Sequence, residues 1–138
     1  MVDMSAFESH PARDVAIQSM LAVEAGDRDG WLALFAADAI VEDPIGPSPM
    51  NESGEPRRGL AAIAEFYDSV IAGGEVRFDI RDSFACGSEV ANVGTITVTF
   101  PGGARSVVDG VYTYRIDDSA KVAALRAYWE FANLEFYP

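Results

Sequence analysis

The chain has 138 residues, close to the roughly 150 expected of one domain, and we expect residues 1–138 to fold as a single unit. Its 49% hydrophobic and 23% charged residues are typical of a soluble globular protein. Ten Lys and Arg against 22 Asp and Glu give a net charge of −12, which argues against binding to nucleic acid or to an anionic membrane surface.

The first half of the chain predicts three helices and one short strand. Pro11 suits a first helical turn, and Gly26 ends that helix. Its predicted stripe comprises Ile17, Met20, Leu21 and Glu24. The second helix is predicted to bury Trp31, Leu34 and Phe35. A short strand then stops at Pro44, and a loop rich in Pro, Gly and Ser leads to the third helix. That helix is predicted to align Ile63, Phe66, Tyr67 and Val70 along one side.

After Gly74 the hydrophobic period changes from helical to two, which predicts strands. In the first strand the inward side chains are predicted to be Val76, Phe78, Ile80 and Phe84. Further strands are predicted at 90–100, 106–116 and 122–133, with turn residues between them. This order indicates an α+β fold in which three helices cover one face of a curved antiparallel sheet. Such a curved sheet can enclose an apolar pocket, where ligands usually bind.

The segment from Val41 to Gly46 carries the most chemical information. Glu42 and Asp43 face opposite ways on a strand, so only one of them can point inward. If Val41 packs toward the core, Asp43 shares its side and Glu42 points to water. An inward carboxylate among apolar groups has a raised pKa and can act as a general base near neutral pH. Alternatively, Asp43 accepts hydrogen bonds from loop amides or begins the turn at Pro44.

The remaining polar residues are interpreted as structural. One histidine and one cysteine cannot supply a histidine-rich zinc site or an internal disulfide. We expect His10 to be a solvated capping residue and Cys86 to be a small buried hydrophobe. Other expected assignments are a solvated pair, Arg57 and Arg58, and the outward-facing Asp109 and Arg115. The acidic start lacks a signal peptide and no apolar run reaches roughly 18 residues, so we expect a reducing, cytoplasmic location and no membrane association.

Three runs resemble the ketosteroid isomerase (steroid delta-isomerase) family of the SnoaL-like and nuclear-transport-factor-like superfamily. They are AGDRDGWLALFAADAIVEDPIG, GLAAIAEFYDS and VDGVYTYRIDDSAKVAALRAYWEFANL. The similarity spans about 15–134, and VEDPIG and AYWEFANL are its most specific parts. The resemblance implies a cone-shaped fold, a small apolar steroid-like ligand, no cofactor or metal, and a homodimer. Thr95, Thr97 and Thr99 lie on the sheet surface that a second copy could cover.

The resemblance also implies roles for individual residues. Asp43 matches the catalytic base, Tyr67 a pocket tyrosine and Trp129 a pocket tryptophan. The two positions that donate hydrogen bonds to the substrate oxygen in the family hold Met20 and Tyr112 instead. An altered oxyanion hole matters, because the loss of one such donor costs about 2.7–4 kcal/mol elsewhere.

Tyrosines could rebuild this oxyanion hole. Tyr112 and Tyr114 share one strand face, and Tyr112 and Tyr67 are the predicted catalytic donors beside Asp43. The predicted substrate-binding residues are Met20, Phe66, Tyr114 and Trp129. Alternatively, the aromatic rings only fill space at the cavity, as amphipathic tyrosines often do.

Three functions fit these observations. The first is a cofactor-independent isomerase that moves a C=C bond of a 3-ketosteroid through a dienolate, with Asp43 as the base. The second is a steroid- or polyketide-binding protein with little isomerase activity. The third is another SnoaL-like activity, such as polyketide cyclisation or epoxide hydrolysis, although no arginine has the strand parity that epoxide opening requires. A dimerisation module comes last, since it needs no inward carboxylate.

Overall fold

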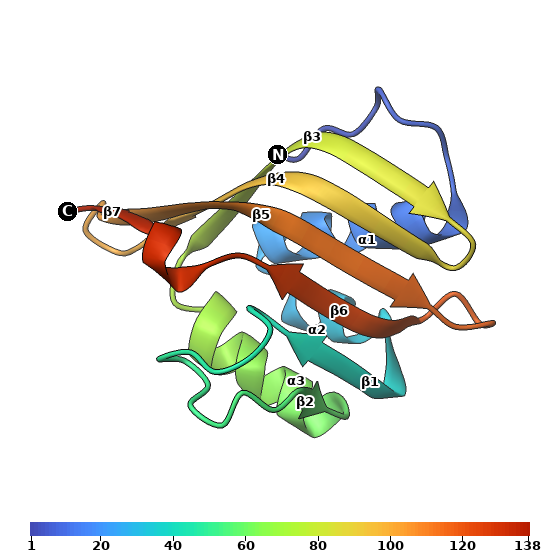
Figure 1. Cartoon of the computed structure of the whole chain (residues 1–138), viewed down its shortest axis with the longest axis horizontal. Coiled ribbons are helices and arrows are strands. Elements are labelled where there is room, and N and C mark those ends of the chain that lie inside the picture. Colours follow the sequence, from blue (N-terminus) through green and yellow to red (C-terminus); the bar gives the residue numbers. More distant parts are fainter.

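A curved sheet covers one side of the molecule and the helices lie behind it (Figure 1). The computed structural model describes all residues, 1–138. Its strands are β1 (Phe35–Glu42), β2 (Arg57–Arg58), β3 (Glu75–Cys86), β4 (Glu89–Thr99), β5 (Arg105–Ile116), β6 (Val122–Tyr128) and β7 (Glu135–Tyr137). They run in the order β2-β1-β6-β5-β4-β3, and β7 pairs with β5. All pairs are antiparallel except β1 with β6, which corrects the expectation of a purely antiparallel sheet.

Three α-helices pack on the inner face of this sheet, which confirms the predicted α+β architecture. They are α1 (Pro11–Ala25), α2 (Arg28–Leu32) and α3 (Leu60–Phe66), and α3 continues into a π-helical turn, η1 (Tyr67–Ile71). A short 3-10 helix, η2 (Phe131–Asn133), follows β6, so the last long strand ends at Tyr128 rather than at residue 133. No helix is both long enough and apolar enough to cross a bilayer.

Helix α1 begins and ends where the sequence predicts, but it buries a different face. The His10 imidazole caps it by accepting from the Ala12 amide, and Gly26 closes it with a φ of 68°. Its buried residues are Ala12, Arg13, Val15, Ala16, Ser19, Met20 and Val23. Of the predicted stripe only Met20 is fully buried, because small side chains form the contact face and weigh little in a hydrophobicity pattern.

Helix α2 is shorter than predicted and Phe35 belongs to strand β1. The helix ends at Leu32, and Phe35 packs edge-on against Trp31 with ring centroids 4.6 Å apart. Leu34 is half-buried, and its carbonyl accepts from the Val122 amide at the start of β6. The buried aromatic pair therefore joins the end of α2 to the start of the sheet.

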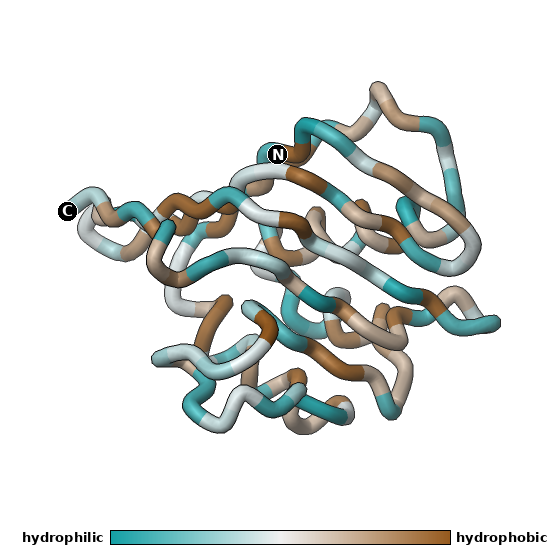
Figure 2. Tube along the Cα trace, in the orientation of Figure 1, coloured by the Kyte–Doolittle hydropathy of each residue, from teal (hydrophilic) through white to brown (hydrophobic).

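Hydropathy alternates along the long strands (Figure 2), but strand β3 changes its parity halfway. Its register with β4 shifts between Ile80 and Asp82, which is a bulge. Val76 and Ile80 point inward before the bulge, whereas Ser83 is buried after it. Phe84 is therefore 65% exposed, contrary to the predicted inward position.

The same parity change corrects the prediction for Cys86, which is an exposed free thiol and not a buried hydrophobe. On the inner face, the bulge is held by a buried polar chain. The Arg13 Nε donates to Ser83 Oγ at 2.9 Å, Ser83 donates to Asn92 Oδ1 at 2.8 Å, and Asn92 donates to the Tyr112 carbonyl at 3.3 Å. This chain ties α1 to three strands at the end of the sheet remote from η1.

Candidate active site

An internal cavity lies between the helices and the inner face of the sheet. Its fourteen lining residues come from α1, α2, α3, η1 and strands β3 to β6, and all except Ser19 are apolar or aromatic. Four of the predicted site residues are among them: Met20, Phe66, Tyr112 and Tyr114. The cavity can therefore hold an apolar molecule, and its hydrogen-bonding groups are the hydroxyls of Ser19 and the two tyrosines.

Asp43 follows strand β1 at the edge of this inner face. Val41 pairs with Leu125 of β6 and is fully buried. Asp43 comes directly after the end of β1, is half-buried, and is not among the residues that line the internal cavity. The Ile45 amide then donates to the Ala127 carbonyl at 3.1 Å, so the chain stays attached to β6 beyond Asp43. The charge of Asp43 acts on both phenols and helps to raise the pKa of Tyr112 and that of Tyr114. Asp43 and the two tyrosines thus form one electrostatic group.

The Asp43 carboxyl has a raised pKa. Burial is the largest cause, and it outweighs two opposing effects: the hydrogen bond from Trp129 and the more distant positive charge of Arg57. Trp129 Nε1 donates to Asp43 Oδ1 at 2.6 Å. The structure therefore brings Trp129 to the predicted base as a hydrogen-bond donor, and not to the wall of the internal cavity.

Glu42 does not point to water as the strand pattern predicts. Its side chain is only 10% exposed and accepts from Arg126 Nε at 3.1 Å, so a half-buried ion pair replaces solvent. Arg57 also differs from the predicted solvated pair. It is half-buried, and its guanidinium lies 4.7 Å from the centre of the Phe66 ring. Phe66 thereby connects the cavity wall to a positive charge that acts on Asp43.

The two cavity tyrosines have different hydrogen-bond partners. Tyr112 donates to the Val108 carbonyl at 3.3 Å, on its own strand. The Tyr114 hydroxyl lies 2.9 Å from Ser19 Oγ, which also accepts from Trp31 Nε1 at 3.0 Å. Burial raises the pKa of each phenol, so both stay protonated at neutral pH and remain able to donate.

The structure does not bring Tyr67 into the cavity lining. Its ring packs against Trp31 with centroids 5.5 Å apart. The pKa of Tyr67 is raised by burial, and the charges of Asp27 and Arg28 act on it as well. Its hydroxyl is therefore directed toward the α2 end of the fold, because Phe66 takes the inward position at the end of α3.

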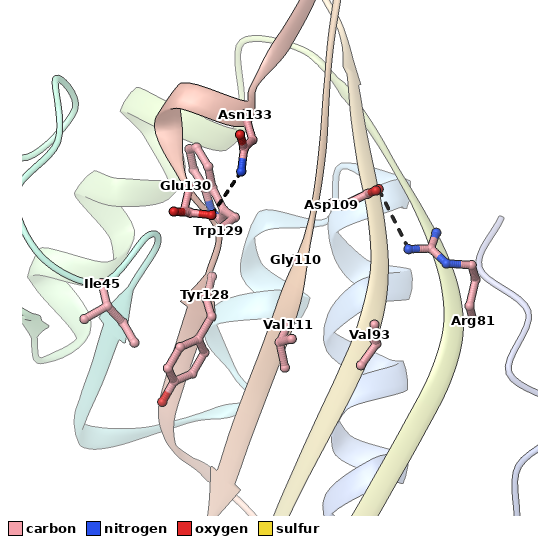
Figure 3. Close-up of a pocket in the computed structure, with 11 residues that line it drawn as sticks. Ile45, Arg81, Val93, Asp109, Gly110, Val111, Tyr128, Trp129, Glu130 and Asn133 are labelled. Atoms are coloured by element: carbon pink, nitrogen blue, oxygen red, sulfur yellow. Dashed lines mark hydrogen bonds and ion pairs between the residues drawn. The ribbon is translucent and has the colours of Figure 1, made fainter.

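A larger groove of about 550 Å³ lies on the opposite face of the sheet (Figure 3). It runs between the end of β6 and the outer sides of β4 and β5, and it contains the Arg81–Asp109 ion pair. Tyr128, Glu130 and Trp129, the donor to Asp43, border it. Asp109 and Arg115 are exposed on this side, as the strand parity predicts. No predicted donor hydroxyl opens into this groove, so the internal cavity is the better candidate for the active site.

Sequence reasoning missed Ser19 and Trp31 as parts of the site. Ser19 lies next to Met20 on α1 and is 1% exposed, but it interrupts the apolar pattern and offers no motif. Its partner Tyr114 is 95 residues away, so only the tertiary structure shows the contact. Trp31 was assigned to the core, and the partner of its indole N–H could not be deduced from spacing.

Comparison with known proteins identifies the family. The SnoaL-like domain matches residues 16–130. A steroid Delta-isomerase from Nocardioides simplex is 32% identical over 117 residues, which cover 85% of this chain and 88% of the relative.

Solved structures agree with this match. The Delta 5-3-ketosteroid isomerase from Mycobacterium sp. is 39% identical with a TM-score of 0.89, over 94% of this chain and 100% of its own. RV0760c from Mycobacterium tuberculosis in complex with estradiol-17beta-hemisuccinate is 35% identical with a TM-score of 0.87. The match covers 93% of this chain and 100% of that protein's chain. SalBIII, an epoxide hydrolase/cyclase-like enzyme of salinomycin biosynthesis, is 22% identical with a TM-score of 0.77 over 91% and 95%, which shows a shared fold alone. The chain belongs to the SnoaL-like superfamily and, within it, to the ketosteroid isomerase family.

Proposed function

We propose that this protein is a cofactor-independent isomerase that moves the C=C bond of a β,γ-unsaturated 3-ketosteroid into conjugation with the carbonyl. The observation that carries the proposal is one carboxyl of raised pKa, Asp43, held by Trp129 at 2.6 Å and close enough to act by its charge on the two protonated phenols of the cavity. The apolar lining of the cavity supports a flat, neutral substrate. The named relatives support the steroid class.

In this mechanism Asp43 acts as a base and then as an acid. Its carboxylate removes a proton from the carbon between the carbonyl and the double bond, which produces a dienolate and a neutral Asp43. The same carboxyl then returns the proton two carbons further along, so the reaction is an intramolecular proton transfer. The raised pKa of Asp43 strengthens it as the base of the first step, because it brings the carboxyl closer to the acidity of the substrate.

The negative charge of the dienolate resides mainly on the former carbonyl oxygen. A donor in a dry site stabilises such an oxygen more than it stabilises the neutral ketone, which lowers the barrier. Met20 can donate nothing, so the cavity phenols are the proposed donors, while Met20 and Phe66 form apolar walls. Trp129 positions the base through its 2.6 Å hydrogen bond.

Substrate entry requires the cavity to widen. It encloses about 100 Å³, less than the roughly 300–1,000 Å³ usual for a small-molecule site. Val70 and Ile71 of η1 form part of its wall. π-Helical turns are rare and are frequent at functional sites.

The test uses a β,γ-unsaturated 3-ketosteroid and follows the ultraviolet absorbance of the conjugated enone. The wild type should convert the substrate, and Asp43→Asn should slow the conversion by about 10²–10⁴-fold, the usual contribution of a general base. Asp109→Asn is the matched control, since Asp109 is an exposed carboxylate on the outer face. Steroid binding without absorbance growth in the wild type would contradict the isomerase and favour a binding protein.

The resemblance also supports a homodimer, in which the outer sheet face covers a second copy. Tyr128 of β6, Phe131 of η2 and Phe136 of β7 are 49%, 43% and 61% exposed, so large apolar side chains near this end of the sheet are available for contact. A sedimentation experiment that finds only monomers at micromolar concentration would contradict the dimer. A reducing, cytoplasmic location remains our proposal and is compatible with the exposed free thiol of Cys86.

A further inference from the structure

The contact between Ser19 and Tyr114 leaves one hydroxyl proton for a ligand. Both residues line the internal cavity, and their oxygens are 2.9 Å apart. Each side chain carries one donor proton, but a single contact uses only one of them. Ser19 Oγ makes hydrogen bonds only with Tyr114 and Trp31, and Tyr114 makes its hydrogen bond only with Ser19. One O–H of this pair is therefore free, and both residues border the cavity.

The Trp31 contact uses one acceptor position of Ser19. An indole N–H only donates, so Ser19 Oγ accepts at that contact and keeps its own proton for another acceptor. The Tyr114 oxygen is the only acceptor within hydrogen-bond distance of that proton. If Ser19 donates to Tyr114, the phenol proton is the free one, and a phenol is a far stronger donor to an oxyanion than an alcohol.

We propose that Tyr114 donates the hydrogen bond to the substrate oxygen and that Trp31 and Ser19 hold it in place. The order of donors is Trp31 Nε1–H to Ser19 Oγ, Ser19 Oγ–H to the Tyr114 oxygen, and the Tyr114 O–H to the ligand. Tyr114 is then a catalytic residue, while Ser19 and Trp31 are positioning residues. This inference rests on the proposed function. It assigns a donor to replace those that the family has at the positions of Met20 and Tyr112.

Tyr112 fits this role less well, although it lines the same cavity. Its only proton is already donated to the Val108 carbonyl at 3.3 Å, within its own strand. A ligand oxygen would have to displace that contact before Tyr112 could donate to it. Tyr114 needs no such exchange. The two tyrosines therefore give a matched comparison, because they lie two residues apart on one strand face and differ in whether their proton is used.

The experiment compares three variants with the wild type by steady-state kinetics on the β,γ-unsaturated 3-ketosteroid. Tyr114→Phe should lower kcat by about 10²–10³-fold. Tyr112→Phe should lower it much less, and the exposed Tyr128→Phe should leave it unchanged. Ser19→Ala should lower kcat by about tenfold with little change in KM, because it loosens the donor without narrowing the cavity. Thermal melting establishes that each variant is folded.

A second measurement does not depend on turnover. A steroid with a phenolic first ring is bound to the Asp43→Asn protein. The asparagine side chain is neutral, like the Asp43 carboxyl once it has accepted the proton of the substrate. Ultraviolet absorbance as a function of pH then gives the pKa of the bound phenol. Adding Tyr114→Phe should raise that pKa by about one to two units, and adding Tyr112→Phe should raise it less.

The results separate this inference from the proposed isomerase. A higher pKa of the bound steroid phenol in the Tyr114→Phe protein supports the Tyr114 donor, even if the wild type proves inactive on the ketosteroid. The Tyr114 donor is overturned if Tyr112→Phe lowers kcat more than Tyr114→Phe does and also raises the pKa of the bound phenol more. The proposed isomerase activity would then still stand. Equal values for Ser19→Ala and wild type, in kcat and in phenol ionisation, overturn the positioning role of Ser19.

Discussion

The indole N–H of Trp129 donates to Oδ1 of Asp43 at 2.6 Å, across the junction between the end of β6 and the turn after β1. Trp129 follows directly after β6, and Asp43 follows directly after β1. The parallel pairing of these two strands brings their carboxyl ends together, which places the donor beside the carboxyl. This hydrogen bond opposes the effect of burial on the pKa of Asp43, so one contact both orients the carboxyl and adjusts its acidity.

The first prediction concerns the pH dependence of Trp129→Phe. Asp43 must be ionised to accept a proton, so kcat/KM rises with pH through the pKa of Asp43. The hydrogen bond from Trp129 favours the ionised carboxylate, and its removal raises the pKa further. The acidic limb of kcat/KM should therefore move to higher pH in Trp129→Phe. Tyr128→Phe is the neighbouring control, and an acidic limb that shifts equally in both variants would refute the effect of the indole.

The second prediction concerns stability. The pKa of Asp43 is raised in the folded state, so the native protein binds more protons than the unfolded chain between the unfolded and folded pKa values. The contribution of Asp43 to the free energy of unfolding then falls as pH rises through this window. At neutral pH the ionised carboxyl is a net cost, and Asp43→Asn should be more stable than the wild type.

This advantage should shrink as the pH falls toward about 4, the ordinary pKa of an aspartate, because Asp43 then becomes protonated in the unfolded chain as well as in the folded state. Urea unfolding at neutral pH and near pH 4 measures the difference. A variant that is less stable than the wild type at neutral pH would show that the ionised carboxylate is favourably held, contrary to its raised pKa.

The third prediction concerns the ion pair behind the base. Arg126→Gln leaves the nearly buried Glu42 carboxylate without its 3.1 Å partner, and it should lower the free energy of unfolding by about 1–3 kcal/mol. Glu42→Gln combined with Arg126→Gln should recover part of this loss, because no unpaired charge remains. Denaturant unfolding of the single and double variants forms a double-mutant cycle, and additive losses would exclude a direct interaction.

Strand alternation was sufficient to place Tyr112 and Tyr114 on one face, because β4 and β5 pair without a register shift. It failed at Ser83 and Phe84, because the bulge in β3 depends on a contact with β4 that the local sequence does not encode. Glu42 was misjudged for a similar reason. Its partner Arg126 lies 84 residues away in the sequence, so strand alternation around Glu42 could not predict the ion pair that allows its burial.

The helix face shows the limit of hydrophobic periodicity. Ala12, Ala16 and Ser19 form the buried contact of α1, although none of them is strongly apolar. Close approach of the helix to the sheet needs small side chains, and a pattern of large hydrophobic residues favours a neighbouring stripe instead. The family resemblance led to Asp43 and Trp129, but the hydrogen bond between them and the contact between Ser19 and Tyr114 required the tertiary structure.

The fourth prediction concerns Gly94, which faces the bulge of β3. A Cβ at this position would lie 2.1 Å from the Asp79 carbonyl oxygen and 2.9 Å from the Ile80 Cα, and both atoms belong to backbone that cannot rotate away. Gly94→Ala must therefore push β3 from β4, and it should lower the free energy of unfolding by about 1–3 kcal/mol. Gly73→Ala is the matched control, since nothing lies within 4 Å of its added Cβ, and it should change stability by less than about 0.5 kcal/mol. Thermal unfolding of the two variants measures the difference. Equal stability would mean that the bulge does not need a glycine opposite it, and the parity change that buries Ser83 and exposes Phe84 would then need another cause.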